Sequence, residues 1–346
     1  MSAPASPGPL GDCLRAGFAR HRTYAPRYGW LLRFHQALLE DPATVTRPDA
    51  PVLLGTGSSM VAAMAFWSQA FGLSHHHPAA ERGVLAPTAR GHWLLDESGA
   101  DPYLELEPTL WLLHYWLVSA PCRVPTWHYL FGHCGASRIS RSQLVERVQL
   151  AAAESGWPRP SGAAVDRDVA CLVSMYGPRQ NGSRPESLEE LVDHPFRALN
   201  LIDTQDGDPG AGPGSQVLVA HSWAGRSAPP GVIVYACLDY AARTCPDRPG
   251  SVTVDRLAHE PGAPGRLLRV PRSVLVAALE RLSAIHGNAF EVIESGDGHQ
   301  ALVFRRPPSL LADQVLGRLY SAAAGPVPQE RDRQMARPVG PPPGAR

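Results

Sequence analysis

Apolar residues recur at helical spacing along most of this 346-residue chain. In residues 27–41, the apolar residues Trp30, Leu31, Phe34 and Leu38 fall on one side of a helix, so this segment predicts an amphipathic helix. Such a helix needs a partner surface for its apolar stripe. We therefore expect the N-terminal region to contribute to a helical core.

Residues 107–120, 140–156 and 166–177 predict three further helices. The first is apolar on nearly all sides, which indicates a helix at the centre of the fold. The second opens with Ser140, and Gln143 follows three residues later, which is the spacing of a capping box. The pattern from residue 107 to residue 177 is thus mostly helical.

Two segments combine helices with a hairpin, and the first lies near the N-terminus. Residues 60–71 predict a helix that is capped by Ser58 or Ser59 and closed at Gly72. Residues 83–96 then read as two short strands. Helices followed by a two-stranded wing are the outline of a winged helix-turn-helix.

The second such segment, near the C-terminus, is clearer. Residues 271–287 predict a helix that opens with a proline and closes with a glycine. Residues 290–306 contain two alternating runs around the turn "SGDG". Winged helices bind DNA in many proteins but dock proteins in others, so the fold alone does not define a function.

The expected fold class is mainly α (α+β): a multi-domain helical protein with N- and C-terminal winged helix-turn-helix-like units, each with a small β-hairpin wing. Gly- and Pro-rich segments predict where the domains divide. The expected parts are a disordered start (1–11), an N-terminal winged-helix-like domain (12–104), a helical middle domain (105–202), a Gly/Pro-rich linker (203–229), a C-terminal winged-helix domain (230–322) and a disordered tail (323–346).

Composition excludes two classes of enzyme. All 32 basic residues are arginine, so the chain has neither the lysine of a Walker-type phosphate loop nor a Schiff-base lysine. The dinucleotide pattern G-x-G-x-x-G is matched only halfway, because Met60 replaces its third glycine. The formal net charge is +0, so any nucleic-acid contact must rely on a local basic patch.

No targeting or membrane signal is evident. No apolar run reaches the roughly 18 residues of a membrane-spanning helix, and the N-terminus lacks a signal-peptide pattern. The six cysteines are scattered without a C-x-x-C pair, so reduced thiols are expected. We therefore expect a cytoplasmic protein without a membrane partner.

The stretch "LGTGSSMVAAMAFWSQAFG" (54–72) resembles the outline of a phosphate-binding loop. Free backbone N–H groups near Gly57, Ser58 and Ser59 would form an anion site at the start of the helix. There, Gly57 is expected to adopt φ > 0 and to permit close approach of a phosphate. The alternative is a capped core helix whose glycines permit close packing, and both interpretations remain open.

Arginines and tyrosines alternate in "RHRTYAPRYGWLLR" (20–33). Arginine suits phosphate contacts and aromatic rings suit base stacking, so the pattern is compatible with nucleic-acid binding. The alternative is a solvated helix face combined with core aromatics. The candidate DNA-binding residues in this segment are Arg20, Arg22, Tyr24, Arg27 and Arg33.

Acidic residues cluster in "DPYLELE" (101–107), and Asp101, Glu105 and Glu107 are the candidate catalytic residues. Carboxylates could hold Mg²⁺ or Mn²⁺ for phosphodiester cleavage. The segment also precedes a proline-started helix, where acids interact favourably with the helix dipole. We favour this structural interpretation, and the metal ligands remain unknown.

A zinc site is a further alternative, in "CRVPTWHYLFGHC" (122–134). Its possible ligands would be Cys122, His128, His133 and Cys134. Their spacing matches no standard zinc module. Buried thiols and packed histidines are therefore favoured here.

Five landmarks, in this order, resemble those of a known bacterial family. They are "FARHRTYAPRYGWL" (18–31), "LGTGSSMVAAMAFW" (54–67), "APTARG" (86–91), "DPYLELEPTLWLLHYWL" (101–117) and "EPGAPGRLLRVPRSVL" (260–275). The family includes the SspB component of the Ssp DNA phosphorothioation system, and its genes lie beside phosphoadenosine-phosphosulfate-reductase-like proteins. One departure is Ser58-Ser59, where family members often carry Lys-Asn.

The resemblance implies a DNA-binding component of a sulfur-modification machine that supports phage defence. It implies strand nicking as a possible activity, with Mg²⁺ or Mn²⁺ as the candidate cofactor. It also implies three protein partners: a cysteine desulfurase, a reductase-like sulfur-transfer protein and an ATPase. Arg90, within the third landmark, joins the candidate DNA-binding residues.

Two functions of other classes remain as alternatives. A winged-helix transcription regulator would bind a defined operator, usually as a dimer. An assembly scaffold would not touch DNA at all. A modification component should instead require partner proteins and show little tight sequence preference alone.

Overall fold

The structure is a computed structural model, and it describes residues 8–14, 17–77, 83–178, 194–205, 216–220, 227–294, 296 and 298–321. Helices dominate this part of the chain, and three small antiparallel sheets accompany them. The expected mainly α (α+β) class is therefore confirmed. Within the described ranges, no helix combines the length and apolar character needed to cross a membrane.

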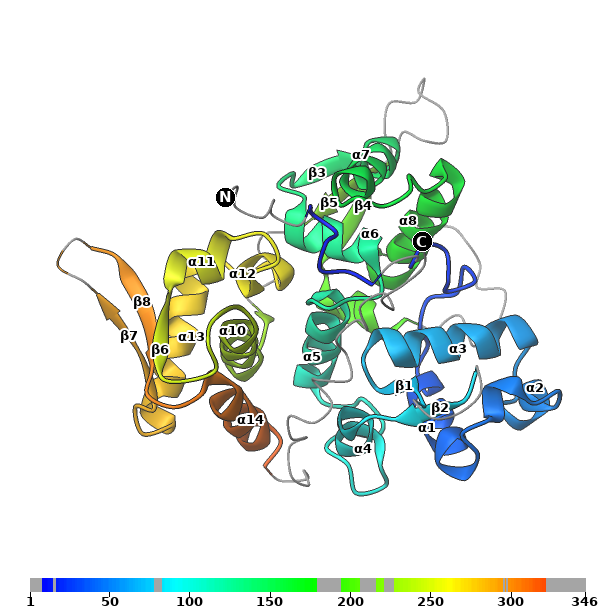
Figure 1. Cartoon of the computed structure of the whole chain (residues 1–346), viewed down its shortest axis with the longest axis horizontal. Helices are drawn as coiled ribbons and strands as arrows, with labels where there is room; N and C mark the ends of the chain where they lie inside the picture. Colours follow the sequence, from blue (N-terminus) through cyan, green and yellow to red (C-terminus); the bar gives the residue numbers. More distant parts are fainter. Residues whose placement is uncertain are drawn as a thin grey trace, which may run out of the picture.

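The N-terminal part consists of short helices beside one two-stranded sheet (Figure 1). Its elements are α1 (Trp30–Glu40), α2 (Ala50–Leu53), α3 (Ser58–Ala70), β1 (Ser74–His76), β2 (Leu85–Pro87) and α4 (Ala89–Leu95). The predicted helix end at Gly72 is confirmed, since Gly72 has φ 71 and the Leu73 N–H donates to the Ser68 carbonyl at 2.8 Å.

Two predictions for this part were wrong. The segment 83–96 contains one strand rather than two, because Thr88 caps α4 by accepting a hydrogen bond from Gly91 N. The partner of β2 is β1, which precedes it. Neither Ser58 nor Ser59 caps α3: the helix begins at Ser58, with Gly57 at the N-cap and no side-chain cap.

The middle part places a buried helix beside a helical layer with a three-stranded sheet. It contains α5 (Glu107–Val118), α6 (Pro125–His128), the π-helical turn η2 (Tyr129–His133), β3 (Arg138–Ser140), α7 (Arg141–Glu154), α8 (Gly162–Tyr176), the 3-10 helix η3 (Pro195–Leu199), β4 (Ile202–Gln205) and β5 (Val217–Ala220). The sheet has the strand order β3-β5-β4. Strand β5 and most of β4 fall in the segment 203–229, which was predicted as a linker. The division of the chain into domains stays a prediction.

The predicted capping box of α7 is confirmed. The Ser140 hydroxyl accepts a hydrogen bond from Gln143 N at 3.2 Å, and the Gln143 side chain accepts one from Ser140 N at 3.1 Å. A Ser-x-x-Gln sequence before an apolar stripe marks the start of a helix through residues that are close together in the chain. The start of the helix was therefore readable without knowledge of the fold.

The C-terminal part forms a helical group with a second three-stranded sheet at its edge (Figure 1). It contains α10 (Pro230–Thr244), β6 (Gly250–Thr253), α11 (Val254–His259), α12 (Pro264–Leu267), α13 (Arg272–Ile285), β7 (Phe290–Glu294), β8 (Gln300–Phe304) and α14 (Pro308–Leu319). The predicted helix 271–287 and hairpin 290–306 are confirmed by α13 and by the pairing of β7 with β8. Strand β6, which pairs with β8, was not predicted.

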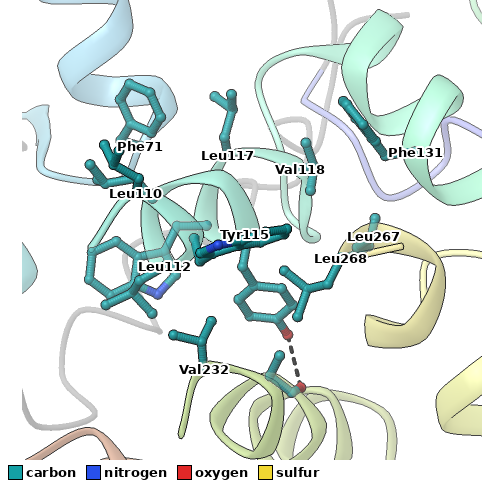
Figure 2. Close-up of a cluster of buried hydrophobic side chains, with 14 of the residues drawn as sticks. Phe71, Leu110, Leu112, Tyr115, Leu117, Val118, Phe131, Val232, Leu267 and Leu268 are labelled. Carbon is teal, nitrogen blue, oxygen red and sulfur yellow. Dashed lines mark hydrogen bonds between the residues drawn. The ribbon is translucent and has the colours of Figure 1, made fainter. Parts of the chain in front are cut away.

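Helix α5 lies at the centre of the molecule, between the N-terminal helices and α10 (Figure 1). Leu112, Leu113 and Leu117 on this helix are 0% exposed, as its sequence predicted. Burying one such side chain contributes about 1.5–3 kcal/mol. Figure 2 shows the surrounding cluster, with Tyr115 pointing toward α10. On that helix, Asp239 Oδ2 accepts a hydrogen bond from the Tyr115 hydroxyl at 2.8 Å.

Candidate functional site

The loop that leads into α1 carries three non-glycine residues with left-handed backbone conformations. Ala19, Arg22 and Thr23 have φ values of 54°, 52° and 69°. Such conformations are unfavourable for L-residues and persist only where the surroundings hold them. We call residues 18–24 the arginine loop, because it carries Arg20 and Arg22.

A buried aspartate on α8 holds the arginine loop. Asp168 Oδ1 accepts hydrogen bonds from Ala19 N at 2.7 Å and from His21 Nε2 at 2.9 Å, and its Oδ2 accepts from Thr126 Oγ1 at 2.8 Å. The Thr23 N–H donates to His21 Nδ1, so the imidazole proton must lie on Nε2, facing the carboxylate. His21 is 0% exposed and Asp168 is 1% exposed. The carboxylate therefore fixes both the backbone and the central side chain of the loop.

This arrangement leaves Arg20 and Arg22 at the surface. Both are exposed, and within the described ranges neither side chain makes a hydrogen bond or an ion pair. Arg123 lies close by: burial lowers its pKa, and the charge of Arg20 lowers it further. Among the described residues, the Arg20 and Arg22 guanidinium groups thus have no direct carboxylate partner, because Asp168 binds the backbone and His21 of the loop instead.

The remaining predicted residues of this segment connect the loop to α1 and α3. The Tyr24 carbonyl accepts a hydrogen bond from Trp67 Nε1 at 2.8 Å, and the Tyr24 ring packs edge-on against Trp30. Arg27 lies over the Trp30 ring at 5.5 Å. Arg33 donates from Nη1 to the Leu54 carbonyl at 3.0 Å, just before the start of α3.

The start of α3 has the features of an open helix N-terminus. Ser58 and Ser59 are exposed, and the first turn contains no acidic residue. A side chain at Gly57 would meet nothing within 4 Å, so the space in front of the helix is open. The first backbone N–H groups of any helix lack partners inside the helix and can bind an anion.

One expectation at this turn was wrong. Gly57 has φ −77° and ψ 157°, an extended conformation that other residues also adopt. The left-handed glycine is Gly55, with φ 58°. The chain reverses two residues earlier than expected, at Gly55, which follows the end of α2.

Arg90 occupies a different environment from the arginine loop. Its guanidinium stacks on the Trp116 ring at 4.1 Å, and its Nη1 lies where a side chain on Gly72 would be. It is half-buried between α4 and α5. These contacts favour a packing role for Arg90, and its role in DNA binding stays a prediction.

The predicted acidic residues do not form a cluster of free carboxylates. Asp101 is 6% exposed, and it accepts hydrogen bonds from Glu105 N and Leu106 N at 2.9 Å and from Thr109 Oγ1 at 2.6 Å. Both oxygens are therefore used to organise the start of α5. Glu105 and Glu107 are exposed, and Glu107 lies in the first turn of α5.

A different group within the described ranges has the geometry of a metal site. His35 on α1 lies with its Nε2 2.7 Å from Asp96 Oδ1, and the His92 Nδ1 lies 3.1 Å from the same carboxylate. Burial lowers the pKa of His35, although Asp96 opposes this shift. Two imidazoles and one carboxylate are suited to ions such as Mn²⁺ or Zn²⁺, whereas Mg²⁺ prefers oxygen ligands.

The predicted zinc ligands are only partly brought together. Cys13 takes the place of Cys134: the Cys13 and Cys122 sulfurs are 2.8 Å apart, and His128 lies beside them. His133 Nε2 is 3.2 Å from His128 Nε2, and His128 Nδ1 lies 2.7 Å from the Val118 carbonyl. Burial raises the pKa of Cys122, but Cys13 and His128 outweigh it and lower the pKa to about 5. This group is buried, so it has no direct route to a macromolecular substrate.

The sequence contained a weak signal for Asp168 but none for Cys13. Asp168 precedes Leu172 by four residues and therefore lies on the apolar face of α8, where a carboxylate needs partners. Cys13 lies 109 residues from Cys122. No spacing rule connects two residues so far apart.

Comparison with known proteins identifies the family. Residues 18–320 match the model of the family described as "Protein of unknown function (DUF4007)". No curated protein sequence matches the chain. The chain belongs to the DUF4007 family.

Two solved structures are similar over nearly the whole chain. One is described as "SspB crystal structure"; it has 37% sequence identity and a TM-score of 0.82, and the match covers 91% of each chain. The other is described as "Magnesium ion-bound SspB crystal structure"; it has 36% identity and a TM-score of 0.80, and the match covers 91% of this chain and 90% of that chain. The resemblance to the family of SspB is therefore confirmed.

Proposed function

We propose that this protein is the DNA-binding component of a DNA phosphorothioation machine that supports phage defence. Its similarity to SspB structures supports the system, and the arginine loop supports the contact with DNA. The protein would engage the target strand in the cytoplasm and present it to partner proteins. These partners would be a cysteine desulfurase, a reductase-like sulfur-transfer protein and an ATPase.

The observation that carries the DNA proposal is the rigid presentation of Arg20 and Arg22. Two exposed arginines without carboxylate partners are held on a strained backbone by the buried Asp168. Guanidinium groups bind phosphate in a fork geometry, and a fixed loop loses little entropy on binding. The open N-terminus of α3, joined to α1 through Arg33, would provide a second phosphate contact.

We further propose that the C-terminal part is a winged-helix unit. Its elements follow the order α10, β6, α11, α12, α13, β7, β8, α14, and the strands pair in the order β6-β8-β7. The N-terminal part has a helix, α3, followed by the hairpin β1–β2, and we extend the proposal to it. The exposed face of α13 combines polar residues, Arg281 among them, with the apolar Ile285, so it does not decide between a regulator that reads bases and a protein-docking unit.

The test is the binding of a duplex DNA by the purified protein as a function of salt. Contacts to the phosphate backbone predict that affinity falls steeply, by about one unit of log–log slope for each phosphate contacted. Binding that is indifferent to salt, or absent at about 50 mM salt, would reject the proposal and favour the scaffold alternative.

A second candidate activity is metal-dependent strand nicking. The group His35, His92 and Asp96 supports it, since its donor set suits a divalent ion such as Mn²⁺. One similar structure is described as magnesium ion-bound, which shows that a related SspB holds a divalent ion. Before an ion binds, His35 Nε2 donates to Asp96 Oδ1, and this contact orients the ring. Coordination through Nε2 would require that proton to move to Nδ1 or to solvent, and the lowered pKa of His35 keeps the ring neutral for this step. A bound ion would supply Lewis-acid activation of a phosphate oxygen.

Relaxation of supercoiled plasmid tests this activity. We expect nicking with Mn²⁺ that exceeds nicking with Mg²⁺, and we expect His92→Ala to abolish it. Glu105→Ala is the matched control and should nick like the wild type, because Glu105 lies outside the group. Equal relaxation in EDTA, or full activity of His92→Ala, would show that the assignment is wrong.

A further inference from the structure

A pocket lies between the middle and C-terminal parts, away from the groups described above. Its volume is about 290 Å³, and it is lined by the π-helical turn on one side and by the segment from α11 to α13 on the other. Its walls include Phe131, Cys134, Arg266, Arg269 and Arg272. Three of these side chains carry a positive charge, and no carboxylate of the described residues lines the pocket.

Arg269 is held in this pocket without a counter-ion. Its Nε is buried and has no hydrogen-bond partner. Its Nη2 donates to the Leu130 carbonyl at 3.2 Å, and its guanidinium lies 5.8 Å from the centre of the Phe131 ring. Burial lowers the pKa of Arg269 to about 10, while Cys134 opposes the shift and Arg266 adds to it.

Arg266 places a second positive charge in the same pocket. Its Nη2 donates to the His133 carbonyl at 3.2 Å, and the residue is half-buried. Within the described ranges, neither Arg266 nor Arg269 forms an ion pair, whereas Arg272 is paired with Asp255 at 3.0 Å. Two like charges thus share one pocket, and only the third has a carboxylate partner.

The backbone of this segment is also fixed. Arg269 has φ 55°, a left-handed conformation that is unfavourable for an arginine. A side chain on Gly265 would lie 2.6 Å from backbone atoms of Ala258, so α11 and α12 pack in direct backbone contact. The backbone of the pocket wall is therefore closely packed at the segment that carries Arg266 and Arg269.

A purely structural role explains only part of this arrangement. Arginines near the C-terminal end of a helix satisfy its last carbonyls, and Arg266 and Arg269 do so for the π-helical turn. Each of these bonds uses one of the five N–H groups of a guanidinium. The role leaves the buried Nε without a partner and two charges uncompensated, which is unfavourable in a low-dielectric site.

We propose that this pocket binds a phosphate-type oxyanion through Arg266 and Arg269. An oxyanion would pair with the free N–H groups, including the Arg269 Nε, and would neutralise both charges. The anion could be a backbone phosphate of DNA or a free phosphate, such as inorganic phosphate or that of a mononucleotide. The site is independent of the arginine loop, so it can exist even if that loop does not bind DNA.

The experiment measures the melting temperature of the full-length protein in increasing inorganic phosphate, at ionic strength held constant with chloride. We expect phosphate to raise the melting temperature of the wild type. Arg269→Gln and Arg266→Gln should each weaken binding by about tenfold, since each removes charge-assisted hydrogen bonds. Arg305→Gln is the matched control, because Arg305 lies in the same part but pairs with Glu291 outside the pocket.

A mononucleotide and a DNA duplex distinguish the two sources of the anion. A shift with phosphate and the mononucleotide would identify a free ligand. If only the duplex binds, and binding depends on Arg266 and Arg269, the ligand is a DNA phosphate. If the Arg269→Gln variant does not fold, the Arg266→Gln variant still tests the proposal, because Arg266 is only half-buried and its substitution should be tolerated. The proposal is overturned if neither Arg266→Gln nor Arg269→Gln weakens the binding of phosphate, the mononucleotide or the duplex.

Discussion

At the scale of single residues, one carboxylate determines how the positive charge is displayed. Asp168 accepts hydrogen bonds from a backbone amide, an imidazole and a hydroxyl, all of them buried or half-buried. Arg20 and Arg22, which would touch DNA, lie on either side of the histidine that it binds. Asp168 itself touches no DNA in this account, so it acts as a positioning residue.

The substitution Asp168→Asn tests this role. An asparagine oxygen in the position of Oδ1 can still accept from Ala19 N and His21 Nε2, but as a neutral acceptor it binds them more weakly than a carboxylate does. The Thr126 hydroxyl then faces an N–H donor, so its own proton loses its acceptor, at a cost of about 1–3 kcal/mol. We expect a lower melting temperature and weaker DNA binding. Asp166→Asn is the control: Asp166 is 46% exposed in its pair with Arg141, and its loss should change both quantities little. Equal behaviour of the two variants would contradict the role of Asp168.

At the scale of elements, the sequence correctly predicted those features that depend on interactions between residues close together in the chain. The capping box of α7, the end of α3 at Gly72 and the β7–β8 hairpin each depend on residues within a few positions of one another. The pairing of β1 with β2 and the strand β6 depend on tertiary contacts of three- and four-residue strands, which carry little signal of their own.

The candidate site also combines residues that are close together in the chain with residues that only tertiary packing brings together. The sequence identified Arg20 and Arg22, since an arginine cluster is visible in the chain itself. It held only a weak signal for Asp168, and none for its contact with His21, which lies 147 residues away, or for the group that joins α1 to α4. Both arise only when distant segments pack together.

The start of α3 provides a prediction at this scale. Ser58→Glu places a carboxylate near the helix N-terminus, where it stabilises the helix by roughly 0.3–1 kcal/mol. The melting temperature should therefore hold or rise, while DNA affinity should fall because the carboxylate repels a phosphate. Ser142→Glu places the same charge in the first turn of α7 and should leave affinity unchanged. If Ser58→Glu also leaves affinity unchanged, α3 is a core helix without an anion site.

At the scale of the whole molecule, His114 connects segments from the middle and C-terminal parts. Its Nε2 donates to the Leu267 carbonyl at 2.9 Å, so its Nδ1 accepts a hydrogen bond from the Tyr176 hydroxyl at 2.8 Å. Helices α5 and α8 and the end of α12 thus meet at one side chain that is 0% exposed. Burial lowers the pKa of His114 to about 4.

This shift predicts how stability depends on pH. The pKa of His114 in the folded protein lies below the usual histidine value of 6.5, so the unfolded chain binds a proton first as the pH falls. The contribution of His114 is complete above about pH 6.5, declines toward about pH 4 and is constant below it, with a total of about 3 kcal/mol. Urea unfolding at several pH values should show a smaller loss in His114→Gln than in the wild type. Parallel curves for both proteins would contradict this assignment.

The central claim is that the arginine loop binds the DNA backbone, and one comparison tests it most directly. DNA affinity is measured against salt for Arg20→Ala/Arg22→Ala and for Arg47→Ala, whose exposed arginine is already paired with Asp41 and Asp49. We predict that the double variant binds more weakly, with a log–log salt slope reduced by about two units, while Arg47→Ala resembles the wild type. Equal affinities and equal slopes in the two variants would contradict the claim.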